Sequence, residues 1–447
     1  MNAFSRRGAC PALSAPMQTG DGLLVRLNPV AGGLSPKELI GLGESALRHG
    51  NGIMEVTARG SLQIRGLTPE SAALLAAEVD ALGIAARTGV PVETGPLAGI
   101  DPQEIADPHP LAERIREAVE EAGLIPRLGP KVSVVVDGGG QLTMDAVTAD
   151  VRLKALRIGA GIQWQVSVAG DGQNARLLAT MRDDAARDIA VAALRMVAEK
   201  GREAHARDLS ERQLVSLAGW LSLTGLREAP LSVLPERGAS PKPIGHFPLA
   251  GDTFALGIAL PYGSMPADKI IALAKSAVGT TEIRLAPGRA LLFLGQSSDT
   301  NQPLQATAAT LSFVTSPTDP RTHIAACPGT PACASGRIAT RAIAETIAKQ
   351  SPDLFDASLT LHISGCAKGC AHPGSAALTL VGDENGAGLV VDGTAKALPA
   401  GYRPGYDAAR AVAAIAAAIR ERHPGETAAA CLTRLGAARV AELYRRN

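Results

Sequence analysis

The sequence predicts an α+β protein made of two similar halves that are related by a pseudo-twofold axis. The first observation is an internal repeat: residues 21–46 (DGLLVRLNPVAGGLSPKELIGLGESA) match residues 252–277 (DTFALGIALPYGSMPADKIIALAKSA) at one constant offset. Apolar positions coincide along the match, as for Leu39 with Ile270 and Leu42 with Leu273. The second observation is that a further segment follows each copy, which gives the order A–B–A′–B′.

Each copy of the repeat predicts the same short series of elements. An apolar strand is followed by a Gly/Pro turn, a helix that begins near Ser35 or Pro266, and a second strand over residues 53–67 or 281–295. Strands around a helix are typical of a small α+β sandwich. Two unrelated βαβ stretches with chance similarity are the alternative, and the agreement of order, spacing and register favours duplication.

The remaining segments complete four expected units. After the first copy we expect a buried strand at Val132–Val136, a turn at Gly138–Gly140 and a helix over residues 182–206. Residues 230–248 are proline-rich and predict a linker, and the chain closes with helices over 408–422 and 428–444. The expected units are a first half-domain with an N-terminal arm (1–100), a domain without paired cysteines (101–229), a linker with the second half-domain (230–318) and a domain with four paired cysteines and the C-terminal helices (319–447).

Composition excludes several classes of protein. Hydrophobic residues make up 46% of the 447 residues and charged residues 19%, which argues against long disordered regions. Lys+Arg (44) nearly balance Asp+Glu (43), so binding of nucleic acid through bulk positive charge is excluded. The apolar run Ala411–Ile419 is too short to span a bilayer, and no signal peptide follows Arg6 and Arg7. We expect a soluble, cytoplasmic protein that binds neither membrane nor nucleic acid.

Four of the six cysteines form a constellation, Cys327-x5-Cys333 and Cys366-x3-Cys370, whereas Cys10 and Cys431 stand apart. In a reducing cytosol, thiols grouped in this way predict metal ligands rather than disulfides. Four thiolates can hold a [4Fe–4S] cluster, one at each iron. Structural zinc prefers closer pairs, so the x5 spacing fits zinc poorly.

These motifs resemble the sulfite and nitrite reductase superfamily. The cysteine spacing, the SGC-x2-GC sequence at residues 364–370 and the duplicated halves are shared features, and Thr57-x-Arg59-x3-Gln63 resembles a strand whose side chains hold tetrapyrrole carboxylates. The resemblance implies a duplicated sulfite/nitrite reductase-like fold, with a ferredoxin-like repeat and a cluster-type α/β domain in each half. It also implies a [4Fe–4S] cluster beside a modified tetrapyrrole at the junction of the halves, held by the domain over residues 319–447. Arg26 falls where the superfamily carries an anion-contacting arginine.

Within that superfamily, residues 6–27 and 364–374 resemble the precorrin-3B synthase family. This resemblance implies a monooxygenase of aerobic cobalamin biosynthesis that uses O₂ and a reductant to hydroxylate precorrin-3A at C20, with γ-lactone formation. Leu128 stands where the reductases carry a lysine, and Lys368 where they commonly carry asparagine, which disfavours reduction of sulfite. No GxGxxG sequence follows a strand, so electrons should come from a separate reductase or ferredoxin supplied by NAD(P)H.

A polycarboxylate substrate needs several fixed cations, and arginine suits carboxylates because its guanidinium binds them bidentately. The substrate-binding candidates are Arg26, Arg59, Gln63, Arg65, Arg127 and Lys131. Arg59 and Arg65 are expected on one strand face, where a solvated β surface would look the same. Arg289 is interpreted as a surface residue that could reach the junction. Since these cations belong to the first half and the cysteines to the second, we predict one site between the halves.

Oxygen activation has no clear signal in the sequence, and no catalytic residue is predicted. A cluster with four cysteine ligands offers O₂ no open iron position, so a mononuclear non-haem iron is a second cofactor candidate. His323, His362 and His372 are the nearby imidazoles, each interpreted first as a hydrogen-bonding residue, and Cys10 is interpreted as structural. Two alternatives stay open: a sirohaem-dependent sulfite or nitrite reductase, and a non-catalytic electron carrier or tetrapyrrole chaperone.

Overall fold

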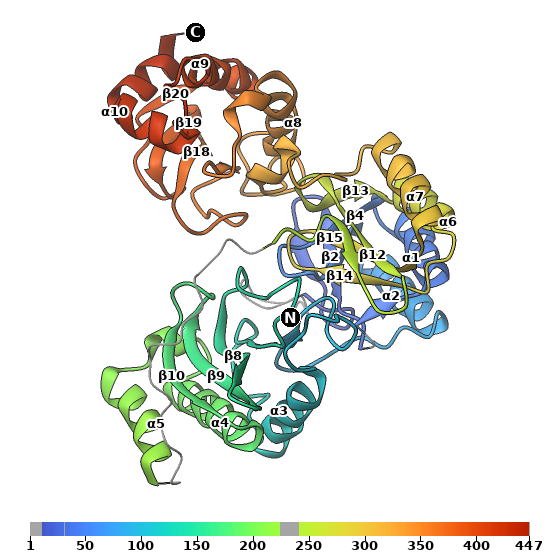
Figure 1. Cartoon of the computed structure of the whole chain (residues 1–447). Coiled ribbons are helices and arrows are strands. Elements are labelled where there is room, and N and C mark those ends of the chain that lie inside the picture. The colour runs from blue at the N-terminus through green and yellow to red at the C-terminus, as the bar shows by residue number, and fades with distance from the viewer. Residues whose placement is uncertain (1–10, 31, 224–240, 447) are drawn as a thin grey trace.

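The computed structural model describes residues 11–30, 32–223 and 241–446, with the backbone alone at 218–223. In Figure 1 the chain forms three lobes. Two half-domains, blue and yellow, share the lobe at the right, the first α/β unit (green) lies below, and the cysteine unit (orange to red) lies above. Within the described ranges, no helix has both the length and the apolar character needed to cross a membrane.

The two half-domains form two five-stranded sheets, ordered β1-β2-β5-β4-β13 and β11-β12-β15-β14-β3. The first half-domain contains β1 (Met17–Thr19), β2 (Gly22–Leu27), β3 (Gly33–Leu34), α1 (Pro36–His49), β4 (Ile53–Val56), β5 (Leu62–Leu67) and α2 (Pro69–Ala81). The second contains β11 (Gly245–Pro248), β12 (Phe254–Ala259), β13 (Ser264–Pro266), α6 (Ala267–Ser276), β14 (Glu282–Ala286), β15 (Ala290–Gln296) and α7 (Ser298–Thr310). The same elements recur in the same order, which confirms the predicted duplication.

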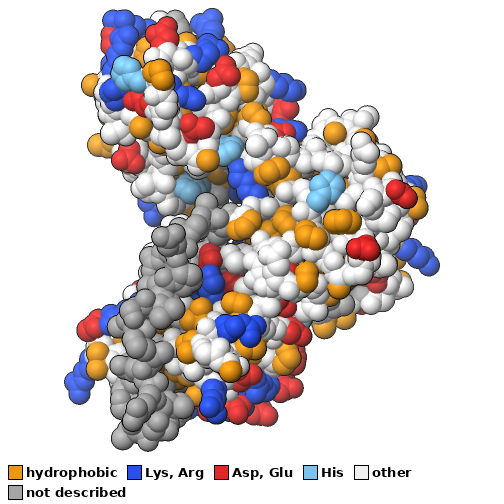
Figure 2. All heavy atoms as spheres, in the orientation of Figure 1, with side chains coloured by type: hydrophobic (Ala, Val, Ile, Leu, Met, Phe, Trp, Pro, Cys, Tyr) orange, Lys and Arg blue, Asp and Glu red, His pale blue; other side chains and the backbone are white. Residues whose placement is uncertain are grey.

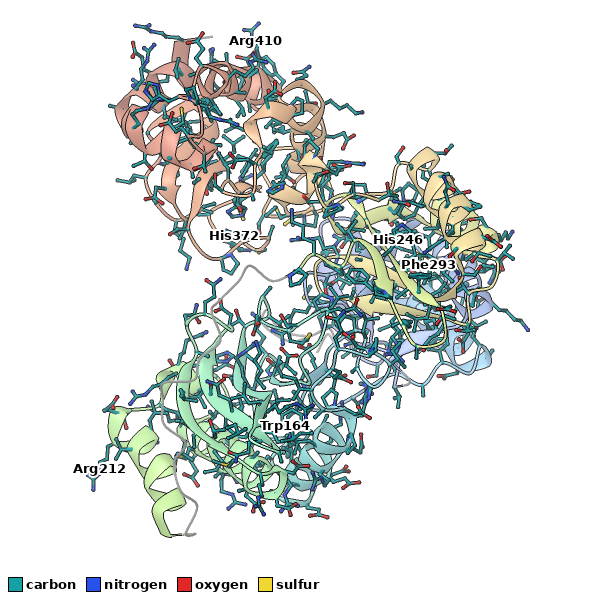
Figure 3. The ribbon with its side chains drawn as sticks, in the orientation of Figure 1. Trp164, Arg212, His246, Phe293, His372 and Arg410 are labelled. Carbon is teal, nitrogen blue, oxygen red and sulfur yellow. The ribbon has the colours of Figure 1, made fainter. Side chains whose placement is uncertain are left out.

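Each sheet is completed by a strand from the other half. β13 pairs antiparallel with β4, and β3 pairs antiparallel with β14. One apolar core contains Leu39 and Leu42 of α1, Ile270 and Leu273 of α6, and Phe293 of β15 (Figure 3). The half-domains therefore share a single core.

The helices of the repeat begin where the sequence predicts. Ser35 caps α1, because its hydroxyl accepts from the Glu38 backbone while the Glu38 carboxylate accepts from the Ser35 backbone. α6 begins directly after Pro266.

The expectation of one strand over 53–67 is wrong, and so is the equivalent expectation over 281–295. Both segments are β-hairpins, β4–β5 and β14–β15, because Gly60 (φ 82°) and Gly288 (φ 88°) adopt left-handed conformations that reverse the chain. Arg59 consequently lies in the turn and Arg65 on β5, so the two arginines do not share a strand face.

The first α/β unit has one sheet, ordered β10-β9-β8-β7-β6, in which β6, β7 and β8 are parallel and the others antiparallel. Its elements are β6 (Val92–Thr94), α3 (His109–Glu121), β7 (Val134–Asp137), β8 (Ala149–Ile158), β9 (Gly161–Gly170), β10 (Arg176–Met181), α4 (Asp183–Lys200), a 3₁₀ turn (Ala206–Asp208) and α5 (Glu211–Leu223). β6, which the division at residue 100 places with the first half-domain, pairs with β7. The turn at Gly138–Gly140 precedes a parallel strand and is not part of a hairpin.

The cysteine unit repeats that topology, with strand order β16-β17-β18-β19-β20 and three parallel strands followed by antiparallel ones. Its elements are β16 (Ile324–Ala326), α8 (Thr340–Gln350), β17 (Leu361–Ser364), β18 (Ala376–Asp383), β19 (Gly386–Gly393), β20 (Gly401–Arg403), α9 (Ala408–Arg420) and α10 (Ala428–Arg446). The two predicted C-terminal helices are confirmed as α9 and α10. In the predicted linker, residues 245–248 form β11, and residues 230–240 lie outside the described residues.

Candidate functional site

The cysteine loops begin at the carboxyl ends of two neighbouring parallel strands. Cys327 follows β16 directly, and Gly365 and Cys366 follow β17. Since parallel strands end at the same edge of a sheet, the loops meet there, and the Gly365 backbone N–H donates a hydrogen bond to Cys327 Sγ (3.1 Å). Cys327 is buried, Cys333 and Cys366 are half-buried, and Cys370 is exposed.

The donor set fits an iron–sulfur cluster. Partial burial raises the pKa of the Cys370 thiol, and the three other cysteines raise it further, so the four sulfurs lie within electrostatic range. The described residues contain no group of three His, Cys, Asp or Glu arranged around one metal ion. In a cubane each thiolate binds a different iron, so a wider arrangement is required.

Glycines leave room at the cysteine loops. A Cβ atom on Gly365 would lie 3.2 Å from the Cα atoms of both Gly329 and Gly336. Any side chain there would push the loops apart, so these glycines permit the close approach of the two cysteine segments.

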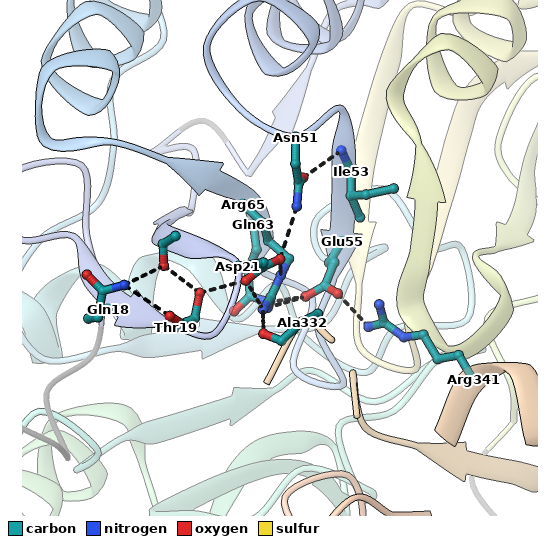
Figure 4. A network of polar contacts seen from close by, with 11 residues as sticks. Gln18, Thr19, Asp21, Asn51, Ile53, Glu55, Gln63, Arg65, Ala332 and Arg341 are labelled. Carbon is teal, nitrogen blue, oxygen red and sulfur yellow. Dashed lines mark hydrogen bonds and ion pairs between the residues drawn. The ribbon is translucent and has the colours of Figure 1, made fainter. Parts of the chain in front are cut away.

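A polar network connects the first half-domain to the first cysteine loop (Figure 4). Arg65, only 4% exposed, donates to Asp21 through Nε (3.0 Å) and Nη2 (2.8 Å), and to Glu55 Oε2 through Nη1 (3.3 Å). Arg65 Nη2 also donates to the carbonyl of Ala332, next to Cys333 (2.9 Å). These contacts use four of its five N–H donors. Arg65 therefore holds the cysteine loop in place, and its role toward a substrate stays a prediction.

Gln63 and Arg341 extend this network around buried Glu55. Gln63 donates to Glu55 Oε2 (2.8 Å) and accepts from Arg26 Nη2 (2.8 Å), which fixes the orientation of its amide. Arg341 of α8 forms an ion pair with Glu55 Oε1. Arg26, Gln63 and Arg65 are thus brought together around Glu55, an acid that the sequence did not single out.

The other predicted substrate residues lie elsewhere. Arg59 donates to Glu93 of β6 (Nε–Oε1, 3.2 Å) and to Ser133 Oγ (3.0 Å), which links the hairpin turn to the first α/β unit. Arg127 and Lys131 are exposed in the loop between α3 and β7. Their roles in binding stay predictions.

Arg289 reaches the junction, in the hairpin turn of the second half-domain. Its backbone is left-handed (φ 69°), and its Nη2 donates to the carbonyl of Ala371 in the second cysteine loop (3.4 Å). Burial lowers the pKa of the Arg289 guanidinium, and the neighbouring charge of Arg341 lowers it further. Figure 2 shows Lys and Arg side chains gathered where the cysteine unit meets the half-domains.

The three histidines have different surroundings. His362 is completely buried, and its ring meets that of His372 edge-on at 5.7 Å between centroids. Burial lowers the pKa of His362 to about 4. His372 Nε2 contacts the carbonyl of Ser375 (3.1 Å), and the side chain points from the cysteine unit toward the space between the lobes (Figure 3). His323 stacks on Phe355 and contacts Lys242, while Cys10 lies outside the described residues.

Comparisons with known proteins agree with this arrangement. Residues 15–82 match the nitrite/sulfite reductase ferredoxin-like half domain family. The solved structure of NirA from Mycobacterium tuberculosis has the same fold (TM-score 0.74, 19% identity, 95% of this chain and 85% of that chain). A precorrin-3B synthase from Sinorhizobium sp. is 41% identical over 445 residues, which cover 99% of this chain and 95% of that protein. The chain belongs to the precorrin-3B synthase family.

For this member of the precorrin-3B synthase family, sequence reasoning missed Asp21, Glu55 and Arg341 and undervalued Arg289. Glu55 is charged within the short strand β4, and Arg341 lies on an amphipathic helix, so both resemble surface residues. A signal was present for Arg289, because it follows Gly288 in a turn equivalent to the one that carries Arg59.

Proposed function

We propose that this chain converts precorrin-3A to precorrin-3B in aerobic cobalamin biosynthesis. One atom of O₂ enters at C20 and a γ-lactone forms, while the other atom leaves as water after taking up two electrons and two protons. The reaction is a monooxygenation, and the electrons come from an external reductase or ferredoxin supplied by NAD(P)H. Membership of the precorrin-3B synthase family supports the substrate class.

The observation that carries this proposal is surplus positive charge at the junction. Within the described residues, Arg65 and Arg289 donate to carbonyls of the two cysteine loops, and Arg341 pairs with Glu55. These three cations face the two carboxylates of Asp21 and Glu55. Arg289 Nη2 donates to the carbonyl of Ala371, which does not neutralise the charge of the guanidinium. A buried charge without a counter-charge is costly, and an acetate or propionate arm of the substrate would supply one.

Cys327, Cys333, Cys366 and Cys370 would hold a [4Fe–4S] cluster, which supplies single electrons when bound. A hydrogen bond links the two cysteine loops: Lys368 Nζ of the second loop donates to Ser335 Oγ of the first (2.7 Å). The mononuclear non-haem iron that the sequence suggested as the oxygen-binding centre finds no group of three His, Cys, Asp or Glu ligands among the described residues, so we derive no step through it.

The proposal is tested by comparing Cys333→Ser with Cys431→Ser, whose thiol is buried in the core of the C-terminal helices. Both proteins are purified without oxygen and assayed for iron, acid-labile sulfide and turnover of precorrin-3A with O₂ and dithionite. We expect Cys333→Ser to lose the cluster and all turnover, and Cys431→Ser to keep both. Full activity in cluster-free Cys333→Ser would refute the proposal.

The sirohaem reductase alternative is decided by the unmodified protein. Stoichiometric, tightly bound sirohaem together with sulfite or nitrite reduction would replace the monooxygenase assignment. Binding of precorrin-3A without any hydroxylated product would favour the chaperone instead.

A further inference from the structure

His362 lies directly beneath the second cysteine loop. On β17, Leu361 and Ile363 point into the core that contains α8 and α9, so His362 faces the opposite side of the sheet. There its Cε1 atom is 3.7 Å from the position that a Cβ would take on Gly369, between Cys366 and Cys370. Since Cε1 separates the two ring nitrogens, this contact places the polar edge of the imidazole against the loop.

Among the residues that the structure describes, neither ring nitrogen of His362 has a hydrogen-bond partner, although the residue has no exposed surface. A neutral imidazole carries one N–H donor and one acceptor, and leaving a buried donor unpaired is destabilising. His372 does not satisfy it, because the two rings meet edge-on and His372 Nε2 contacts the Ser375 carbonyl. A group that binds at the loop would supply the missing partner.

We propose that His362 donates a ring N–H hydrogen bond to a sulfur of the [4Fe–4S] cluster or of its cysteine ligands, and that this bond raises the reduction potential of the cluster. The inference rests on the cluster of the proposed function. Hydrogen bonds to the sulfurs are among the factors that set cluster potentials. Reduction adds negative charge to the sulfurs, so an N–H donor stabilises the reduced form more than the oxidised form. His362 is thus a positioning and tuning residue.

Potentiometric titration without substrate, followed by electron paramagnetic resonance, measures this effect. His362→Leu removes the donor, His362→Gln restores an N–H group, and His372→Phe is the matched control because it keeps the ring contact with His362. We expect His362→Leu to lower the equilibrium constant for one-electron reduction about tenfold, or ~59 mV. His362→Gln should recover part of this loss, and His372→Phe should leave the potential close to that of the wild type.

Resonance Raman spectra provide a second readout. Exchange into D₂O shifts the Fe–S stretching bands wherever an N–H group bonds to sulfur, and the backbone N–H of Gly365, which donates to Cys327 Sγ, contributes in every variant. We therefore expect a smaller shift in His362→Leu than in the wild type, and a larger one again in His362→Gln. A water molecule bridging His362 to the backbone would instead leave the potential unchanged in His362→Leu, which would overturn the inference while the proposed function stands. If His362→Leu assembles no cluster, His362→Phe takes its place, because it also lacks an N–H group but keeps a ring; an unchanged potential and an unchanged D₂O shift in that variant overturn the inference. A wild-type protein without any cluster would remove both proposals.

Discussion

Replacing Arg65 by methionine should weaken both the fold and the first cysteine loop. Methionine keeps the apolar stem but removes every donor, so Asp21 and Glu55 lose their shared cation and the Ala332 carbonyl loses its hydrogen bond. Both carboxylates lie in poorly solvated surroundings, with Glu55 only 4% exposed.

The magnitude follows from burial. Breaking a buried ion pair by removing one partner costs about 3–5 kcal/mol, because the remaining charge is left uncompensated. Glu55 keeps Arg341 and Gln63 as partners, which places the expected loss at the lower end, about 3 kcal/mol. The matched control is Arg48→Met: Arg48 pairs with Glu78 in the same half-domain, but its side chain is 56% exposed. Such a surface pair contributes about 0–1 kcal/mol.

Urea unfolding monitored by circular dichroism gives the free energy of unfolding, and iron and sulfide analysis gives the cluster content. We expect Arg65→Met to be destabilised well beyond Arg48→Met and to load less cluster, since Ala332 precedes Cys333. Equal stabilities of the two variants, together with equal iron contents, would refute the reasoning that Arg65 is a structural link between the halves.

Three further outcomes are expected. Burial raises the pKa of Glu104 from 4.5 to about 7, so between these pH values the folded protein keeps a proton that the unfolded chain has released. The free energy of unfolding should therefore fall as the pH rises from 4.5 to about 7. Melting temperatures measured over this pH range should fall less in Glu104→Gln than in the wild type. Gly60→Ala should destabilise by more than Gly83→Ala in thermal melts, because both have positive φ but only at Gly60 would the Cβ lie 2.9 Å from the Ala286 carbonyl carbon. Arg289→Met should raise KM for precorrin-3A about tenfold or more with a smaller change in kcat, since a hydrogen bond to a charged group contributes about 1.5–3 kcal/mol; an unchanged KM would remove Arg289 from the binding surface.

Much of the fold is predictable from local patterns. The repeat places α1 and α6 correctly because apolar residues recur at helical spacing and Ser35 is a strong N-cap. The cysteine loops are predictable because their cysteines form two close pairs in the sequence, and Gly365 permits the close approach of the two loops.

What the sequence did not predict depends on distant contacts. β3 and β13 are two and three residues long, and their partners lie in the opposite half, so no local pattern reveals the pairing. The sequence does not show that Arg59 forms an ion pair, because its partner Glu93 lies on β6 in another unit of the fold. From the sequence, Glu55 would be taken for a surface charge, whereas in the structure it forms ion pairs with Arg65 and Arg341.

The exchange of β3 and β13 also governs how the chain is made. As synthesis proceeds from the N-terminus, the sheet of the first half-domain lacks β13 until more than half of the polypeptide has left the ribosome. Until then, the backbone N–H and C=O groups at the outer edge of β4 have no strand to pair with. Contacts this far apart in sequence form late, because closing long loops costs entropy before any pairing is gained. If the two halves were expressed as separate polypeptides, each would carry a strand that the other needs, and we expect them to become stable only on meeting.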